Sequence, residues 1–279
     1  FYICYQYSLS QVYIFSVDNT ITKPYTDVSV SVNYTLTKES SMERAKNYDK
    51  VFAINVDVQN DFCPGGALGV KEGDMVVPPL NAVNNWVRKK DGAVIFTADW
   101  HPRDTAHFAE YGGPWPPHCI RYTAGAAFHD QLLIEDGDTV ARKGTGRVDD
   151  GYSGYFADLD TNSPLYRPEF GRYDIGIYRV DGAIKEAIGV YGKKQRKLAV
   201  VVGGLATDYC VKATVLDLLN ESSKKAEYAN NLGVFVLRDA IRAVDINEGD
   251  GDEAIAEMEA AGAVMITSDE VLNGALQVA

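Results

Sequence analysis

Runs of apolar residues alternate with amphipathic segments from Val51 to the C-terminus. Each of six short, mostly apolar runs is typical of a buried strand, and they span residues 51–57, 93–98, 138–143, 198–202, 234–239 and 263–267. Helices are predicted for residues 75–90, 183–192, 207–220 and 252–261, with a short helix at the C-terminus. Strands that alternate with helices indicate βαβ units. We therefore expect an α/β fold with a six-stranded parallel sheet and helices on both faces.

The predicted strands end in polar residues. Asp57 and Asp99 stand at the ends of the first two strands, Lys143 ends the third, and a Gly-containing turn leads from the fourth to Cys210. Right-handed crossovers place the carboxyl ends of parallel strands along one edge of the sheet. Ligands of such sheets bind outside that edge. We therefore expect these four residues to share one site.

Cys210 lies at the beginning of the predicted helix 207–220. Thr207 and Asp208 are favourable N-cap residues. The unpaired amides and the positive end of the helix dipole favour a thiolate, and the same amides suit a negative oxygen formed by attack on a carbonyl. The alternative is a cysteine that packs as a small apolar residue.

Asp57 and Lys143 complete a candidate catalytic set with Cys210. A carboxylate within hydrogen-bond reach of a thiol accepts its proton during attack. A lysine between the two groups stabilises both anions. The alternative is a structural ion pair at the strand ends, and the nearby cysteine at a helix start favours the catalytic interpretation.

A second candidate site contains Asp99, His101, His107 and His118. Asp99 and His101 are two residues apart, so both side chains face one side of an extended segment, and the other histidines follow in the next loop. Carboxylate and imidazole ligands suit Zn²⁺, Fe²⁺ or Mn²⁺. A single histidine is usually structural, whereas three in one loop favour a metal. Cys119 is an alternative ligand or nucleophile, but it lacks a helix start and a nearby base.

The composition narrows the class of partner. A formal net charge of −12 over 279 residues argues against nucleic acid or an anionic membrane as the main partner. Four cysteines without a CxxC pair favour a reduced, cytoplasmic environment. No apolar run approaches the ~20 residues that cross a bilayer. The phosphate-loop and dinucleotide-binding motifs are absent as well.

Residues 1–48 differ from the remainder of the chain. They are rich in Tyr, Ser, Thr and Val and contain no glycine. We expect them to form an N-terminal extension that is poorly ordered or outside the native domain. Residues 1–41 are expected to be translated from upstream of the native start or to be poorly ordered, since the first methionine is Met42. Residues 49–279 are then expected to form one α/β domain.

Several motifs occur in a characteristic order between residues 51 and 272. They are Asp57-Val-Gln-Asn-Asp-Phe62 with Pro64-Gly-Gly-Ala-Leu68, Asp99-Trp-His101, Trp115-Pro-Pro-His-Cys119, Lys143-Gly144 with Tyr152-Ser-Gly-Tyr155, and Gly204-Leu-Ala-Thr-Asp-Tyr-Cys-Val211. Together they resemble the nicotinamidases (pyrazinamidases) of the isochorismatase-like cysteine hydrolases. The cysteine, acid and lysine elements indicate the superfamily, and the Asp-x-His and Trp-Pro-x-His-Cys elements narrow the resemblance to nicotinamidases.

The resemblance implies a three-layer α/β/α fold and hydrolysis of nicotinamide to nicotinate and ammonia through a thioester, a step of NAD salvage. Pyrazinamide is expected as an accepted analogue. By this resemblance Cys210 is the nucleophile, Asp57 the general base and Lys143 the third member of the triad. The backbone amides of Ala206 and Cys210 form the oxyanion hole, beside a cis peptide between Leu205 and Ala206.

The resemblance also implies roles for the metal and pocket residues. Asp99, His101 and His118 bind one divalent ion, with zinc expected ahead of iron or manganese, and the ion holds the pyridine nitrogen directly or through water. His107 matches a ligand found in part of the family. The residues expected to enclose the ring are Phe62, Leu68, Trp115 and Tyr152.

Other functions fit parts of this pattern. Related hydrolases of N-carbamoyl or ureido amides use the acid–lysine–cysteine set without the metal loop, so metal content distinguishes them. A vinyl-ether hydrolase of the same fold does not need Cys210, and a non-catalytic metal-binding scaffold does not need the catalytic set. Residues 158–179 form a longer connection than the fold requires and are a candidate lid or a contact of a homo-oligomer.

Overall fold

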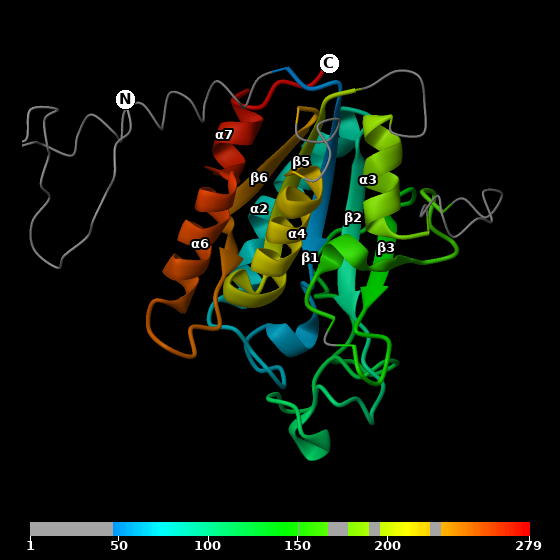
Figure 1. The fold of residues 1–279 in the computed structure, drawn as a ribbon, viewed down its shortest axis with the longest axis vertical. Coiled ribbons are helices and arrows are strands. Elements are labelled where there is room, and N and C mark those ends of the chain that lie inside the picture. Colours follow the sequence, from blue (N-terminus) through cyan, green and yellow to red (C-terminus); the bar gives the residue numbers. More distant parts are fainter. Residues whose placement is uncertain (1–46, 150, 167–177, 190–195, 224–229) are drawn as a thin grey trace, which may run out of the picture. The chain divides into compact units, whose positions relative to one another are not determined.

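A computed structural model describes residues 47–149, 151–166, 178–189, 196–223 and 230–279 (Figure 1). Within them, a seven-stranded sheet has the order β4-β3-β2-β1-β5-β6-β7. Its strands are β1 (Lys50–Val56), β2 (Ala93–Asp99), β3 (Thr139–Lys143), β4 (Asp158–Leu159), β5 (Leu198–Leu205), β6 (Leu232–Arg242) and β7 (Val264–Ile266).

Neighbouring strands pair in parallel except β3 with β4. The expected α/β class is confirmed, and the six predicted strands form the parallel part of the sheet. The predicted number of six strands is too low by one, because β4 adds an antiparallel strand at one edge. A strand of two residues is too short to produce a hydrophobic period, so the sequence pattern could not reveal it.

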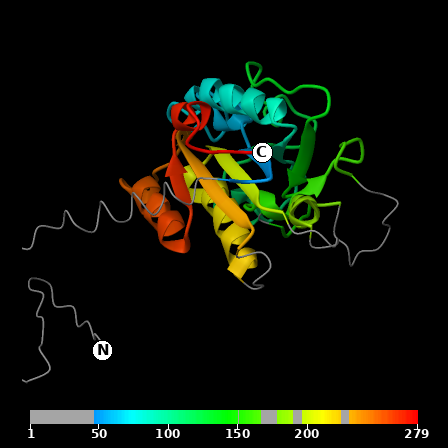
Figure 2. The same ribbon diagram turned by 90° about the horizontal axis from the view of Figure 1, so that it is seen from above.

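Helices cover both faces of the sheet (Figures 1 and 2). One face carries α2 (Val77–Lys89) and α7 (Ser268–Leu272), and the other carries α3 (Val180–Ile188), α4 (Lys212–Ser223) and α6 (Asp250–Ala261). Pro78 and Pro79 lie in the first turn of α2, where a missing N–H costs no helical hydrogen bond. Gly189 and Gly262 end α3 and α6 in the left-handed conformation.

β1 is a central strand with a core on each side. Phe52 and Ile54 pack into the apolar cluster beneath α3 and α4, whereas Val51 and Ala53 pack into the cluster beneath α2. Asn55 is buried on the same face as Val51 and Ala53, and it exchanges side-chain hydrogen bonds of 3.1 and 3.0 Å with Asn84 of α2. Because this buried amide is paired, its burial is tolerated.

The carboxyl end of β5 extends beyond its predicted limit. The strand runs to Leu205 rather than ending near residue 202. Gly204 has a φ of +124°, and a Cβ at this position would collide with the backbone of Val56 in β1. The glycine therefore allows close passage of two strands. The helix predicted for residues 207–220 follows, as a π-helical turn (Thr207–Val211) continued by α4.

Some expectations fall outside the described residues. Residues 1–46 of the expected extension and residues 167–177 of the long connection are among them. The described chain is part of the domain from Tyr48 onward, since Tyr48 bridges to Val278 and its ring lies 5.7 Å from that of Phe235. Among the helices that the structure describes, none combines the length and the apolar character that a bilayer span requires.

Candidate active site

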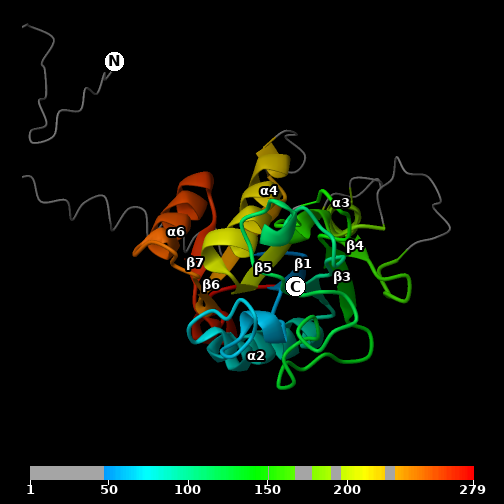
Figure 3. The same cartoon turned by 90° about the horizontal axis from the view of Figure 1, so that it is seen from below.

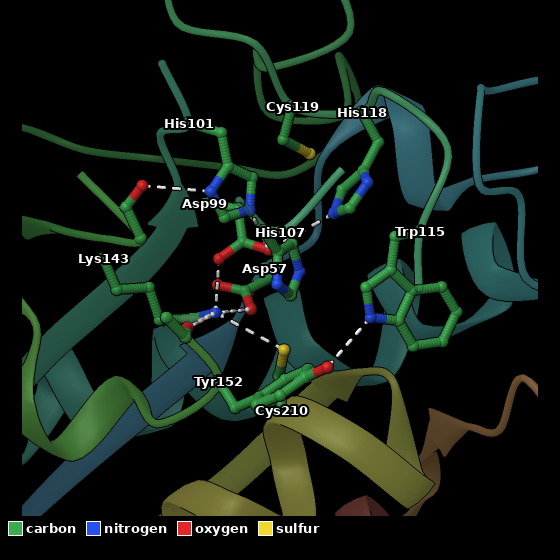
Figure 4. Close-up of polar contacts among 12 residues, drawn as sticks. Asp57, Asp99, His101, His107, Trp115, His118, Cys119, Lys143, Tyr152 and Cys210 are labelled. Atoms are coloured by element: carbon green, nitrogen blue, oxygen red, sulfur yellow. Dashed lines mark hydrogen bonds and ion pairs between the residues drawn. The ribbon is translucent and has the colours of Figure 1, made fainter. Parts of the chain in front are cut away.

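The carboxyl ends of four strands meet at one edge of the sheet (Figure 1). Figure 3 views this edge from below. Asp57 follows β1, Asp99 and Lys143 are the last residues of β2 and β3, and Cys210 lies in the helical turn after β5. All four are buried, and their side chains converge (Figure 4). The structure therefore brings together the residues that the strand-end pattern selects.

The Lys143 ammonium joins the other three groups. Its Nζ lies 2.7 Å from Asp57 Oδ2 and 2.5 Å from Asp99 Oδ1, and it lies 3.4 Å from Cys210 Sγ. It also donates a hydrogen bond of 2.5 Å to the carbonyl oxygen of Gly151. Burial opposes the charge, but the two carboxylates raise the pKa of Lys143 well above its usual value. Lys143 therefore acts as a fixed cation.

Asp57 is fully buried, with a left-handed backbone at φ 49°. Its Oδ1 accepts a hydrogen bond of 2.7 Å from Thr97 Oγ1, and its Oδ2 faces Lys143. Burial raises the pKa of Asp57 to about 6, although the Lys143 charge opposes this shift. A carboxyl group with this pKa gains and loses a proton near neutral pH, which suits a general base that later acts as an acid.

Cys210 does not have the lowered pKa that its position at a helix start predicts. Burial raises the pKa of its thiol well above the usual value, and the charges of Asp57 and Asp99 add to this effect against the opposing Lys143. The expectation that the helix start lowers this pKa is therefore wrong, because it left out the burial of the thiol and, as a smaller effect, the two carboxylates. A base must remove the thiol proton during the reaction, and a carboxylate oxygen of Asp57 lies within 4.8 Å of Cys210 Sγ.

Three imidazoles and a carboxylate face a common space beside this set (Figure 4). Ligand atoms of His101, His107 and His118 lie within 4.8 Å of one another. Asp99 Oδ2 is 3.5 Å from His101 Nε2 and 4.0 Å from His118 Nε2. The Nδ1 atoms of His101 and His118 contact backbone carbonyl oxygens at 3.0 and 2.8 Å. These contacts turn the Nε2 atoms toward the common space.

The chemistry of this donor set fits a divalent ion. His101 Nε2 is buried and has no hydrogen-bond partner among the described residues, which is rare for a buried polar atom. Burial lowers the pKa of His107 to about 4, and it also lowers that of His118. Both imidazoles are therefore neutral at physiological pH, the form that binds metal. Neutral imidazoles with a carboxylate suit Zn²⁺ and similar ions.

Cys119 lies outside both sets. Its backbone N–H donates a hydrogen bond of 2.7 Å to Asp61 Oδ2, and its side chain packs in the core cluster beneath α2. Burial raises the pKa of its thiol well above the usual value. These surroundings favour a structural role over the alternatives of ligand or nucleophile.

A pocket lies between the catalytic set and the histidines. The residues that line it are Phe62, Leu68, Asp99, His107, Trp115, His118, Tyr152, Ala206, Tyr209, Cys210 and Val244. All four residues predicted to enclose an aromatic ring are in this wall. Trp115 Nε1 donates a hydrogen bond of 2.8 Å to Tyr152 Oη, and Tyr209 meets Trp115 edge-on at 4.9 Å. Tyr209 and Val244 were not predicted, although Tyr209 directly precedes Cys210 in the sequence.

Sequence reasoning also missed two residues that hold the metal side in place. Gln59 is fully buried, and its side chain accepts a hydrogen bond of 2.8 Å from Asp99 N and donates one of 2.9 Å to Asp99 O. Asp61 accepts the N–H of Cys119, directly after the last of the three histidines. No local period indicates these contacts, because Asp57 has a left-handed backbone and Asp61 lies in a 3₁₀ turn (Asn60–Phe62), so the segment is not extended.

Comparison with known proteins identifies the family. Residues 52–148 match the isochorismatase domain. The chain is 34% identical to the nicotinamidase of Escherichia coli over 227 residues, which cover 76% of this chain and 92% of the relative.

Two solved structures share the fold. One is a pyrazinamidase of Pyrococcus horikoshii in complex with zinc, with 31% identity and a TM-score of 0.58 over 78% of this chain and 99% of that one. The other is PnC1 from L. infantum in complex with nicotinate, with 29% identity and a TM-score of 0.58 over 81% of this chain and 96% of that one. With the site geometry above, these relatives show that the chain belongs to the nicotinamidase family of isochorismatase-domain hydrolases.

Proposed function

We propose that this protein is a nicotinamidase, a metal-dependent cysteine amidohydrolase that converts nicotinamide to nicotinate and ammonia for NAD salvage. The observation that carries this proposal is the position of Asp99. One carboxylate oxygen pairs with Lys143 beside Cys210, and the other faces His101 and His118. A flat ring in the pocket between them therefore presents its ring nitrogen to the histidines and its carboxamide to Cys210.

The pKa values of Asp57 and Cys210 are both raised, so the reaction begins with transfer of a proton between these two residues. Asp57 accepts the thiol proton of Cys210 as Sγ attacks the carboxamide carbon, and Lys143 remains a cation beside the thiolate that develops. Asp57 then returns the proton to the departing nitrogen, ammonia leaves, and a thioester remains. A water molecule that loses a proton to Asp57 cleaves the thioester, which releases nicotinate and restores the thiol.

The turn between β5 and the helix supplies the groups for the developing oxyanion. The peptide between Leu205 and Ala206 is cis, in accord with the expectation from the family. Ala206 lines the pocket together with Cys210. We assign the backbone N–H groups of these two residues to the oxyanion hole, where fixed donors stabilise the charge that forms on the carboxamide oxygen.

Asp99, His101, His107 and His118 are the residues that would hold the ion. Three observations support this assignment: the burial of the four residues, the lowered pKa values of His107 and His118, and a buried His101 Nε2 that makes no hydrogen bond within the described structure. When bound, the ion supplies a Lewis-acidic position for the pyridine nitrogen, directly or through water. The zinc complex of the Pyrococcus horikoshii relative supports zinc as the ion.

Free cysteines support a cytoplasmic location and a reduced active site. Cys63, Cys119 and Cys210 are unpaired and buried in the described structure. A nucleophilic thiol must remain reduced, and a cytoplasmic environment keeps thiols in that state. We also propose pyrazinamide as a second substrate, because the same aromatic wall encloses either ring.

The test is ammonia release from nicotinamide by the purified protein, supplied in turn with Zn²⁺, Fe²⁺ and Mn²⁺. We expect turnover with at least one of these ions. The rival activity on N-carbamoyl or ureido amides is assayed in parallel, with and without a chelator. Metal-independent turnover of an N-carbamoyl substrate, with none of nicotinamide, would establish the rival function.

A further inference from the structure

The Lys143 ammonium occupies a space that is built like a metal site. Asp57 and Asp99 each direct one carboxylate oxygen at Nζ, at 2.7 and 2.5 Å. The carbonyl of Gly151 adds a third oxygen at 2.5 Å, and Cys210 adds a sulfur at 3.4 Å. Lys143 and the three residues whose side chains surround it, Asp57, Asp99 and Cys210, are between 0 and 6% exposed. An ammonium has three protons, so this shell holds one more ligand atom than the ion can serve with hydrogen bonds.

The same atoms form a donor set for a divalent cation. One ligand atom each from Asp57, Asp99 and Cys210 lie within 4.8 Å of one another. Carboxylate oxygen and thiolate sulfur are ligands of Zn²⁺, and a thiolate is soft enough to favour Cd²⁺ as well. Asp57 Oδ2 is buried and makes no hydrogen bond within the described structure, so the Lys143 charge is what compensates it.

We propose that the space around Lys143 Nζ is a latent divalent-cation site, and that the tethered ammonium of Lys143 excludes an ion from it and keeps Cys210 free as a nucleophile. The proposal deepens the proposed function, since it concerns how a cysteine enzyme works beside a bound metal. Asp99 is shared, with Oδ1 at the latent site and Oδ2 at the histidines. Without Lys143, one carboxylate would bridge two ions, an arrangement known from two-metal sites.

The charges explain why a covalently attached cation is effective here. Two buried carboxylates require positive charge whether or not a thiolate is present, because uncompensated buried charges are strongly destabilising. Lys143 supplies positive charge, and its contact with the sulfur is a hydrogen bond of 3.4 Å rather than a coordinate bond. A divalent ion in the same position would coordinate the sulfur of Cys210, withdraw electron density from it and so weaken it as a nucleophile.

The experiment compares the wild type with Lys143→Met, whose side chain ends one atom short of the Nζ position and carries no charge. Both proteins are freed of metal, incubated with Cd²⁺ and washed, and bound cadmium is measured. We expect about one ion per chain in the wild type and about two in Lys143→Met. The ultraviolet charge-transfer band of a cadmium–thiolate bond should appear only in the variant, and Lys143→Met/Cys210→Ser should lack it.

Lys185→Met is the matched control. Lys185 pairs with buried Asp181 at 2.5 Å, so this variant also takes a lysine away from a buried carboxylate. Asp181 keeps Arg179 at 3.0 Å, and the latent site is not opened. This variant should bind the same amount of cadmium as the wild type. Because Lys143→Met leaves two carboxylates uncompensated, its melting temperature is also measured with and without Zn²⁺, and Zn²⁺ should raise it more than in Lys185→Met.

Equal cadmium content in the wild type and Lys143→Met, or a second ion without the thiolate band, would overturn the proposal. An unfolded Lys143→Met protein that Zn²⁺ and Cd²⁺ both fail to stabilise would overturn it too. A wild type that binds no ion while Lys143→Met binds one with the thiolate band would support the latent site and refute the metal at the histidines. The two proposals are therefore distinguishable.

Discussion

The two halves of the site share Asp99 and differ in the source of their positive charge. On the catalytic side, Asp99 Oδ1 and Asp57 surround the ammonium of Lys143, which is part of the chain. On the other side, Asp99 Oδ2 faces His101 and His118. Burial lowers the pKa of His118, so that imidazole contributes no charge at physiological pH.

This difference shows which half of the site the polypeptide supplies with positive charge without an added ion. The catalytic half contains its own cation, Lys143, whereas His101 Nε2 on the other half is buried and makes no hydrogen bond among the described residues. The first half should therefore keep its geometry when metal is removed, and the second should not. Changes on the catalytic side should act on bond cleavage, and changes on the histidine side should act on metal and substrate binding.

The largest effect should come from removing the nucleophile. Cys210→Ala should lower kcat for ammonia release by about 10⁴-fold or more, because the thioester route is lost. Its metal content, measured by elemental analysis, should equal that of the wild type. Cys63→Ala removes another buried thiol and should retain activity. Turnover close to that of the wild type in Cys210→Ala would remove the catalytic half from the mechanism.

Removing the base tests the same half with a smaller change. Asp57→Asn keeps the shape of the side chain and the hydrogen bond from Thr97, but its amide cannot take the thiol proton. We expect kcat to fall by about 10²- to 10⁴-fold. The metal content of this variant should equal that of the wild type, which separates a lost base from a lost fold. Retention of full kcat would assign proton transfer to another group.

His101→Ala should break the other half. His101 contributes a buried Nε2 to the common space of the imidazoles. We expect metal affinity to fall by at least about 100-fold, since even outer residues of metal sites change affinity by 10- to 100-fold. KM for nicotinamide should rise by a larger factor than kcat falls. A chelator added to the wild type should reproduce this pattern, and an unchanged KM in both experiments would contradict it.

Much of this comparison was available from the sequence. Asp57, Asp99 and Lys143 follow from a topological rule, because parallel strands deliver their carboxyl ends to one edge. The histidines follow from their crowding in one loop. What these residues share is that their chemistry is visible in the residue type, so a short pattern is enough to find them.

The missed features depend on surroundings that only the folded chain provides. The raised pKa of Cys210 comes from burial and from two carboxylates on other strands. Gln59 has an ordinary polar side chain, and its role becomes visible only when its partners on Asp99 are known. Strand β4 is held by pairing with β3 rather than by a pattern of its own. Such properties are set by long-range contacts, which local periodicity does not encode.

Gln59→Ala should weaken the metal half without touching a ligand. The variant removes both hydrogen bonds that hold the backbone of Asp99, so the carboxylate loses its fixed position between the two halves. We expect metal affinity to fall by about 10- to 100-fold. Asn60→Ala is the control, because Asn60 is adjacent, exposed and bonded to Ala124 O rather than to the site. Equal metal affinities in the two variants would reduce Gln59 to a packing role.

The smallest effect should come from the wall that both halves face. Tyr152→Phe keeps the ring but removes the oxygen that accepts the hydrogen bond of Trp115 Nε1. A hydrogen bond of this kind contributes about 0.5–1.5 kcal/mol, so KM should rise by about two- to tenfold while metal content stays constant. Tyr111→Phe, at a half-exposed tyrosine, should leave KM unchanged. A loss of metal in Tyr152→Phe would show that this wall supports the histidines, and a fall in kcat alone would place it with Cys210.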